Sequence, residues 1–120
     1  MKKITISVRV HIAVEDIESL LDSASRACSY WAVGVEKLAY ESGVKAIMSG
    51  KGHCSIKLLD DDLNGKDRGF ILNLDRVKRG LTCMAKKEPK HFADILDENA
   101  DDDTADVFMQ CALLNEVIYG

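Results

Sequence analysis

Polar and apolar residues alternate at the start of the chain, over residues 3–12 (KITISVRVHI). The apolar members are Ile4, Ile6, Val8, Val10 and Ile12. Successive side chains of a strand point to opposite faces, so an extended chain would place these five on one face. This period of two predicts a half-buried strand.

From Ala13 the apolar residues take the spacing of a helix. They are Ile17, Leu20, Leu21, Ala24 and Cys28. One face of a helix would bury this set. Glu15, Asp16 and Glu18 lie near the start of the stripe, where the helix dipole favours negative charge. A helix is therefore predicted directly after the first strand.

The middle of the chain is richer in strand signals. Residues 29–40 (SYWAVGVEKLAY) carry many aromatic and β-branched side chains, which predicts a second strand. Residues 41–52 contain three glycines and two serines and are expected to be a loop, with or without a short strand around residues 44–48. The apolar runs 54–59 and 70–74 flank Asn64-Gly65, a pair typical of a tight turn, so they predict a hairpin.

The last third of the chain reads as helices. Asp75 is a suitable N-cap for a helix that carries a stripe of apolar residues. Gly80 lowers the stability of this helix, so we expect that close packing requires a glycine at this position. The stripe is Val77, Leu81, Met84 and Ala85. Pro89 should separate this helix from a short one. The short helix carries Phe92, Ile95 and Leu96, and the final helix carries Val107, Cys111, Leu114 and Ile118.

These elements together predict an α+β fold in one domain covering residues 1–120. It should contain a small antiparallel sheet of three to four strands, a helix after the first strand, and two to three C-terminal helices. A chain of 120 residues is the size of one domain.

Composition narrows the function classes. The net charge of −4 makes general nucleic-acid binding unlikely, and the short apolar runs predict no membrane span, so we expect a cytoplasmic protein. The four cysteines never form a Cys-x-x-Cys pair, and reduced thiols are expected. We predict no metal and no cofactor.

The acidic stretch DENADDDTADVF (residues 97–108) resembles a calcium loop at first sight. Such a loop needs Gly at its sixth position and Glu at its twelfth, where this chain has Asp102 and Phe108. The stretch instead predicts the start of the last helix, with Asp103 or Thr104 as its cap.

Charge is distributed in blocks along the C-terminal half. Residues 76–90 carry six bases and one acid, whereas residues 94–106 carry seven acids and no base. The blocks could form two solvated faces, pair within the chain, or mediate self-association.

Aromatic and titratable residues supply the candidate site. Trp31, the single Trp, follows Tyr30, and strand alternation would turn one ring inward and the other outward. The pair is either a core Trp with a half-exposed Tyr, or an aromatic platform in a pocket or interface. His91 and Asp94 share a helix face, while His53 and Cys54 should point apart. The candidate ligand- or interface-binding residues are Tyr30, Trp31, Arg79, His91, Asp106 and Gln110; none is assigned as catalytic.

A family resemblance adds to this picture. The helix leading into SYW, the hairpin before RGLTCMAKKEPKHFADIL and the ending DDDTADVFMQCALLNEVIYG resemble a family of small, mostly uncharacterised phage and prophage proteins. The resemblance covers nearly the whole chain. Ala27-Cys28 and Asn115 stand where the family pattern suggests glycines, so the approach of a ligand to the backbone could differ there.

The resemblance implies a phage or prophage setting. By analogy, we expect a non-enzymatic, homo-oligomeric protein that binds a host protein stoichiometrically and inhibits a host defence system. The alternative is a nucleotide-binding module that sequesters a signalling nucleotide, with Tyr30 and Trp31 stacking on the base and the basic helix meeting phosphate. A small hydrolase that uses His91 or a thiol is the third class.

Overall fold

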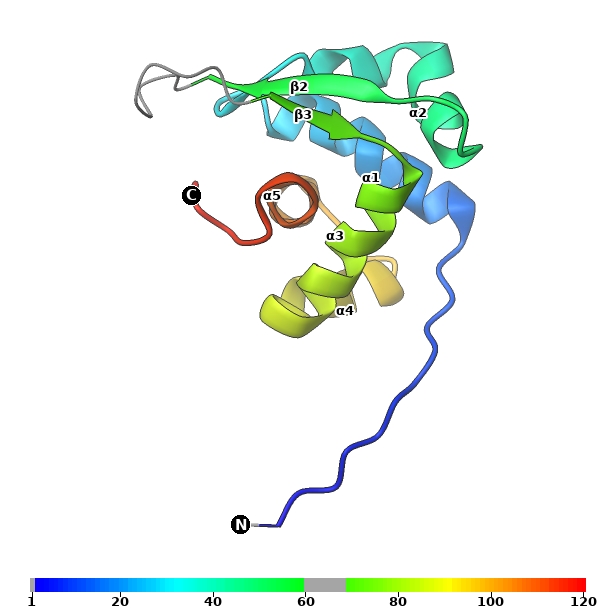
Figure 1. Ribbon diagram of the computed structural model, residues 1–120, viewed down its shortest axis with the longest axis vertical. Coiled ribbons are helices and arrows are strands. Elements are labelled where there is room, and N and C mark those ends of the chain that lie inside the picture. Colours follow the sequence, from blue (N-terminus) through cyan, green and yellow to red (C-terminus); the bar gives the residue numbers. More distant parts are fainter. Residues whose placement is uncertain (1, 60–68) are drawn as a thin grey trace.

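The computed structural model describes residues 2–59 and 69–120 and has an α+β fold (Figure 1). The helices are α1 (Val14–Ala27), the 3-10 helix η1 (Val35–Ala39), α2 (Glu41–Met48), α3 (Leu74–Lys87), α4 (Pro89–Leu96) and α5 (Asp102–Leu114). The strands are β1 (Ala32–Val33), β2 (Cys54–Leu58) and β3 (Gly69–Leu72), which form an antiparallel sheet in the order β1-β2-β3. The predicted fold class is confirmed.

Helix α5 lies at the centre of the core. It packs against α3 and α1 and also touches β3 (Figure 1). Phe108 and Gln110 project from different faces of α5, yet both are fully buried. The sequence predicted one buried apolar face, from Val107 to Ile118, but α5 is buried on more than one face. A helix enclosed by several neighbours is buried on most of its surface.

The ends of α5 are set by two local motifs. The Asp101 carboxylate accepts a hydrogen bond from the Thr104 backbone N–H at 2.9 Å, and the Thr104 hydroxyl accepts one from the Asp101 backbone N–H at 3.2 Å. The acidic stretch thus begins the helix, as predicted, but the N-cap is Asp101 rather than Asp103 or Thr104. At the other end Asn115 adopts a left-handed conformation (φ 66°), so Ile118 lies beyond the helix.

Helix α1 confirms its predicted stripe. The buried residues Ile17, Leu20, Leu21 and Ala24 face the core, and Cys28 is buried directly after the helix ends. None of the five is more than 8% exposed. Glu15 and Asp16 occupy the first turn, where negative charge is favourable.

The half-buried strand predicted over residues 3–12 is not part of the chain's own sheet. Residues 2–13 form an extended N-terminal arm that leaves the body of the molecule (Figure 1). Ile4, Ile6 and Val8 are 93%, 76% and 75% exposed. Alternation favours an extended backbone, but a strand also needs a neighbour, and the sheet lies at the far end of the molecule from the tip of the arm.

The segment after Trp31 also differs from the predicted long strand over residues 29–40. Only Ala32–Val33 pair with β2, and the chain then turns at Gly34 (φ 97°) into η1. A Cβ on Gly34 would lie 2.6 Å from the Ser55 carbonyl oxygen, so glycine is required where the backbone crosses β2.

The loop predicted over residues 41–52 is wrong for residues 41–48, which form α2, whereas residues 49–52 form a turn after the helix. Val44 and Ile47 stand three apart and are 8% and 0% exposed, which anchors this short helix to the core. The glycines and serines around these two residues are typical of a loop, so the sequence did not predict the helix.

The predicted hairpin is confirmed by strands β2 and β3. Their pairing runs from Cys54 opposite Leu72 to Lys57 opposite Gly69. Cys54, Ile56 and Leu58 are buried and alternate with exposed residues, as expected for a sheet with one covered face. The predicted Asn64-Gly65 turn lies outside the described residues.

Helix α3 begins earlier than predicted. The Asn73 side chain accepts a hydrogen bond from the Arg76 backbone N–H at 2.9 Å, so Asn73 is the N-cap rather than Asp75. Pro89 opens α4, as the sequence predicts.

The predicted packing reason for Gly80 is confirmed at the crossing of α3 and α5. A Cβ on Gly80 would lie 2.6 Å from the Cβ and 2.8 Å from the Cα of Ala112. The missing side chain lets the two helix backbones approach closely.

Candidate functional site

The carboxylate of Asp106 is the centre of a hydrogen-bonded cluster between α5 and the end of α1. The Tyr30 hydroxyl donates to Oδ2 at 2.5 Å, and the Trp31 Nε1–H donates to Oδ1 at 2.7 Å. The Gln110 amide donates to the same Oδ1 at 3.1 Å, and the Cys28 thiol lies 3.8 Å from it. One carboxylate thus satisfies polar groups from two distant parts of the chain.

Local backbone structure brings these side chains together. After α1, the N–H groups of Trp31 and Ala32 both donate to the Cys28 carbonyl, at 3.1 and 2.9 Å. This turn directs the Trp31 ring into the core, where it is 2% exposed, while Tyr30 remains 51% exposed. Asp106 and Gln110 are four apart on α5 and therefore share a face.

Gln110 extends the cluster to the C-terminal segment. Its Oε1 accepts hydrogen bonds from the backbone N–H groups of Ile118 and Tyr119, at 2.7 and 2.8 Å. Its Nε2 donates to the Tyr119 carbonyl at 2.9 Å. The Tyr119 ring stacks on Trp31, with centroids 5.5 Å apart and an interplanar angle of 11°. The fully buried Gln110 is thereby satisfied at both ends of its amide.

Five of the six candidate residues therefore lie in one region. Tyr30, Asp106, Gln110 and His91 line a hollow of about 640 Å³ beside α5, and Trp31 lies behind it. Arg79 is not among them, because it lies on a different hollow on α3.

Two members of the cluster were not predicted from the sequence as site residues. The helical spacing of the sequence places Cys28 only in the buried stripe of the first helix. Tyr119 carries no local signal, since its position depends on the chain turning back after Asn115.

His91 has a distinctive position at the edge of this hollow. Its Nδ1 is buried and has no hydrogen-bond partner among the described residues. The side-chain hydrogen bond that its spacing to Asp94 would permit is therefore not formed through Nδ1.

Contacts within the cluster occupy most of the Trp31 side chain, so little of its surface is accessible to a ligand. One ring face is covered by Tyr119, and Nε1 donates to Asp106. The structure thus supports the core role of Trp31 and the half-exposed position of Tyr30, and Trp31 is not free to stack on a base.

The thiols are the other potential nucleophiles. All four cysteines are free and buried. Burial, together with the negative charge of Asp106, raises the pKa of Cys28, and burial also raises that of Cys54. Burial and the neighbouring Cys83 raise the pKa of Cys111 to about 12. The exposed His53 and buried Cys54 point apart, as predicted.

We expect the folded protein to react with a thiol reagent about tenfold or more slowly than the urea-unfolded chain, because a buried neutral thiol is a poor nucleophile. Thiol release can be followed by absorbance. Ser29→Cys, at an exposed position next to Cys28, supplies a control that should react rapidly. A native thiol that reacts as fast as this control would contradict the expectation and favour a thiol enzyme.

The same thiols give a pH dependence of stability. The folded pKa of Cys111, about 12, lies above the value of roughly 8.5 for an unfolded chain. The unfolded state therefore loses its proton first, and this contribution to stability is lost as the pH rises between those two values.

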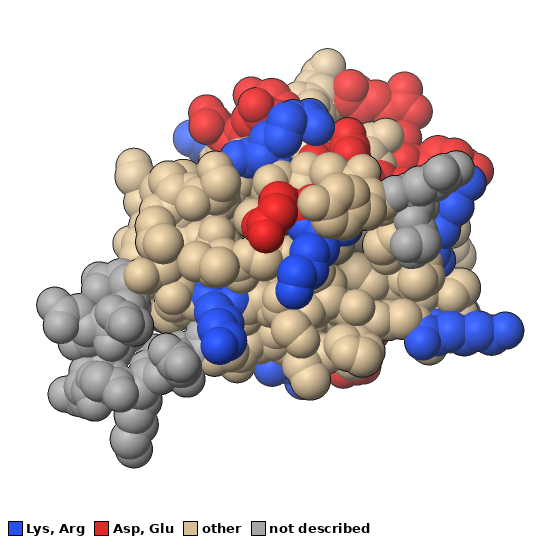
Figure 2. All heavy atoms as spheres, turned by 90° about the horizontal axis from the view of Figure 1, so that it is seen from above, with Lys and Arg blue, Asp and Glu red and all other residues tan. Residues whose placement is uncertain are grey.

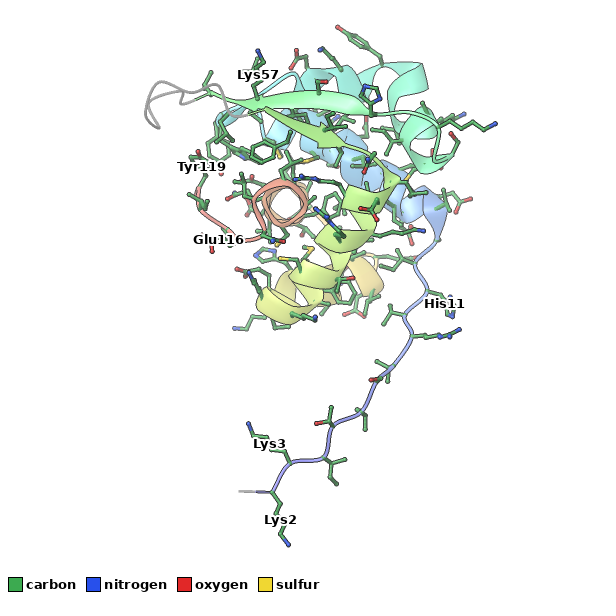
Figure 3. The ribbon with its side chains drawn as sticks, viewed as in Figure 1. Lys2, Lys3, His11, Lys57, Glu116 and Tyr119 are labelled. Atoms are coloured by element: carbon green, nitrogen blue, oxygen red, sulfur yellow. The ribbon has the colours of Figure 1, made fainter. Side chains whose placement is uncertain are left out.

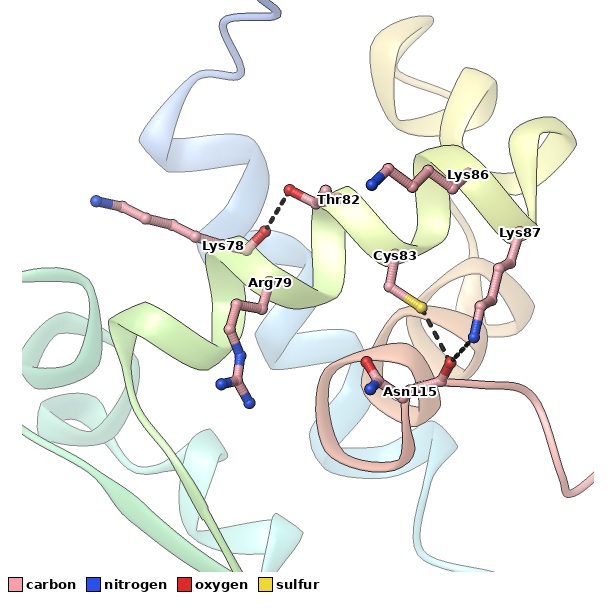
Figure 4. Close-up of a pocket in the computed structure, with 7 residues that line it drawn as sticks. All are labelled: Lys78, Arg79, Thr82, Cys83, Lys86, Lys87 and Asn115. Atoms are coloured by element: carbon pink, nitrogen blue, oxygen red, sulfur yellow. Dashed lines mark hydrogen bonds between the residues drawn. The ribbon is translucent and has the colours of Figure 1, made fainter.

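A second hollow, the basic groove, lies along α3 (Figure 4). Its volume is about 600 Å³, and it is lined by Lys78, Arg79, Thr82, Cys83, Lys86, Lys87 and Asn115. Spacing of four residues produces two rows, one containing Lys78 and Lys86 and the other containing Arg79 and Lys87. The Asn115 carbonyl accepts a hydrogen bond from Lys87 Nζ at 2.6 Å, which fixes one cation at the end of α5.

The basic groove contrasts with the acidic residues elsewhere on the surface. Asp97, Glu98 and Asp101–Asp103 are exposed around the start of α5. The ion pairs formed by the described residues, Asp22–Arg26 and Asp75–Arg79, lie within single helices and do not join the two blocks. Figure 2, which views the molecule from above, shows most of the Asp and Glu side chains along one edge of this face, with Lys and Arg side chains both beside them and scattered over the rest of the face.

Among residues 2–59 and 69–120, no three His, Cys, Asp or Glu side chains are grouped closely enough to hold a metal ion. In the same part of the chain, no helix has the length and apolar character needed to cross a bilayer.

No family model, no curated protein and no solved structure matches the chain.

Proposed function

We propose that this chain is a non-enzymatic binding protein of phage or prophage type, which inhibits a host defence system by binding an acidic surface of a host protein. The phage setting and the defence target rest on the sequence resemblance. The binding role rests on one structural observation, the basic groove of α3.

The basic groove is suited to an anionic partner. Four cations line it, and none of the described residues that line it is acidic. Lys78, Arg79, Lys86 and Lys87 are all exposed, so a partner can reach them without unfolding the helix. Complementary charge across an interface increases the association rate and excludes partners of the wrong charge.

The helix that carries the groove is well fixed. Asn73 caps its start, and its opposite face packs on α5 through Val77, Gly80 and Met84. A rigid helix face positions its charged groups with little loss of backbone entropy on binding.

The reactive groups of the protein are better explained as structure than as catalysis. Asp106 accepts hydrogen bonds from Tyr30, Trp31 and Gln110, and the thiols are buried. A general base or nucleophile must instead reach a substrate atom within hydrogen-bond distance. These observations favour binding over hydrolysis.

A nucleotide remains the second candidate ligand, because a hollow of about 600 Å³ bordered by four cations also has the size of a small-molecule site. If the ligand is a nucleotide, its phosphates would contact the lysines of the basic groove. The aromatic pair would take no part, since Tyr30 borders the other hollow.

Fluorescence anisotropy with a labelled oligoglutamate peptide and, separately, labelled ATP tests this proposal. Lys78→Glu/Lys86→Glu should weaken peptide binding about tenfold or more, corresponding to roughly 1.4 kcal/mol. We expect the weaker binding because two attractive contacts become repulsive. Lys45→Glu, on an exposed site of α2, changes charge away from the groove and should bind almost normally.

The two ligand classes give different outcomes. Tight binding of ATP with no binding of the peptide would favour the nucleotide alternative. Peptide binding that is unchanged in the double variant would contradict the groove, and nucleotide or peptide turnover that disappears in His91→Ala would favour the hydrolase.

A further inference from the structure

We propose that two copies of this chain pair through their N-terminal arms, with each arm lying antiparallel to the other and entering an apolar groove on the other copy. The occupant of this groove is thus the arm of a second copy. The inference is independent of what binds the basic groove.

The arm is unusual because its apolar side chains are exposed. Ile4 and Ile6 are 93% and 76% exposed, and the exposure falls to 47% at Val10 near the body. Figure 3 shows the arm projecting from the molecule, with Lys2 and Lys3 at its far end and His11 near its base. An extended chain with unpaired backbone groups and one apolar face is a template for pairing with another strand.

The body of the molecule offers a groove of matching chemistry beside the base of the arm. This arm groove has a volume of about 430 Å³. One wall is the arm itself, through Val8, Val10 and Ile12, and the other wall includes Leu81 and Phe92 of α3 and α4. A second strand laid beside the base of the arm would place its apolar residues in this space.

The alternating sequence is complementary to itself in an antiparallel pair. Residues directly opposite each other in such a pair point to the same face. If Val8 lies opposite Val8 of the second copy, Ile6 lies opposite Val10 and Ile4 lies opposite Ile12. The exposed tip of each arm then reaches the apolar groove at the base of the other.

Charge favours the same register. With Val8 at the centre, Lys3 lies opposite Ala13 and Lys2 lies opposite Val14. Both lysines then approach Glu15 and Asp16 in the first turn of the other copy's α1. A shift of two residues toward the N-terminus moves these lysines away from the acids, so the charges disfavour that shift.

The arm groove adjoins the basic groove, since Lys78, Thr82 and Lys86 border both. Pairing would hold two basic grooves on either side of the arm ribbon. A partner with two acidic patches would then gain avidity from the dimer.

Light scattering on the full chain tests the pairing. At micromolar concentration the protein should have twice the 13.3 kDa mass of one chain. Val8→Glu places two carboxylates opposite each other and should give a folded monomer, because residue 8 is 75% exposed within one chain. Ser7→Glu adds the same charge on the polar face, opposite Arg9, and should remain a dimer.

A strict monomer in the wild type would overturn the proposal, as would a dimer that persists in Val8→Glu. Cysteine cross-linking tests the register, and the native thiols give little background because they are buried. Val8→Cys should form a covalent dimer on mild oxidation, whereas Ser7→Cys should not. The reverse result would overturn the register. Binding of the oligoglutamate peptide to the Val8→Glu variant measures the basic groove independently of the pairing of the arms.

Discussion

Replacing Asp106 with Ala is expected to lower the free energy of unfolding by about 2–5 kcal/mol, because a buried donor left without an acceptor costs about 1–3 kcal/mol. The Trp31 Nε1–H and the Gln110 amide both donate to the Oδ1 of Asp106, and both residues are buried. Gln110 also holds the C-terminal segment, so the Tyr119 ring should become mobile in the variant. Urea unfolding measures the change.

Two matched variants show whether this loss comes from the hydrogen bonds. Asp106→Asn keeps the size and one carbonyl acceptor, and should cost about 1–2 kcal/mol. Asp103→Ala removes an exposed carboxylate from the same helix and should change stability by less than about 0.5 kcal/mol. Equal losses in Asp106→Ala and Asp103→Ala would show that the cluster is not a stabilising centre.

Gly80→Val is expected to destabilise the protein by about 3 kcal/mol or more, since overpacking a close contact typically costs about 1–3 kcal/mol. Even the first added carbon would lie 2.8 Å from the Ala112 Cα, so α3 and α5 must separate. Gly80→Ala should be destabilising too, although Ala favours a helix by about 1 kcal/mol over Gly.

Thermal unfolding of these variants gives a clear comparison. Thr82→Ala changes an exposed residue of the same helix and controls for helix propensity. Ala112→Gly combined with Gly80→Ala should recover part of the loss, because it removes the Cβ at 2.6 Å but leaves the backbone contact. Stabilisation by Gly80→Ala alone would contradict the close helix crossing.

The elements that the sequence predicted correctly are those whose signal is local. The α1 stripe buries its residues as expected, and β2 alternates between buried and exposed positions. The buried position of Trp31 and the exposed position of Tyr30 were also predictable, because adjacent residues of an extended segment point to opposite sides. In these cases the period of the apolar residues directly reflects one buried face.

The wrong predictions depended on contacts that a linear sequence does not display. Helix α2 buries Val44 and Ile47 and packs Met48 partly against the core, a short apolar set that its neighbouring glycines and serines outnumber in the sequence. The alternating arm has the pattern of a strand but pairs with no strand among the described residues. Helix α5 is buried on several faces because α1, α3, α4 and β3 all contact it, and this enclosure is a tertiary property.

The candidate site was predicted in part for similar reasons. Tyr30, Trp31, Asp106 and Gln110 meet because the end of α1 packs beside α5, a contact between positions about 75 residues apart. Arg79 is one of the predicted site residues, yet α3 turns it toward another surface. Tyr119 could not be predicted, because Gln110 positions it only after the chain has reversed direction at Asn115.

Sedimentation velocity with a labelled oligoglutamate peptide tests the central claim, stoichiometric binding by paired copies, most directly. The peptide should sediment with a species of twice the 13.3 kDa chain mass plus bound peptide, saturating at one peptide per basic groove. Raising the salt concentration should release it, because the exposed charges of the groove are then screened. Peptide that sediments alone beside a protein of single-chain mass would contradict the account.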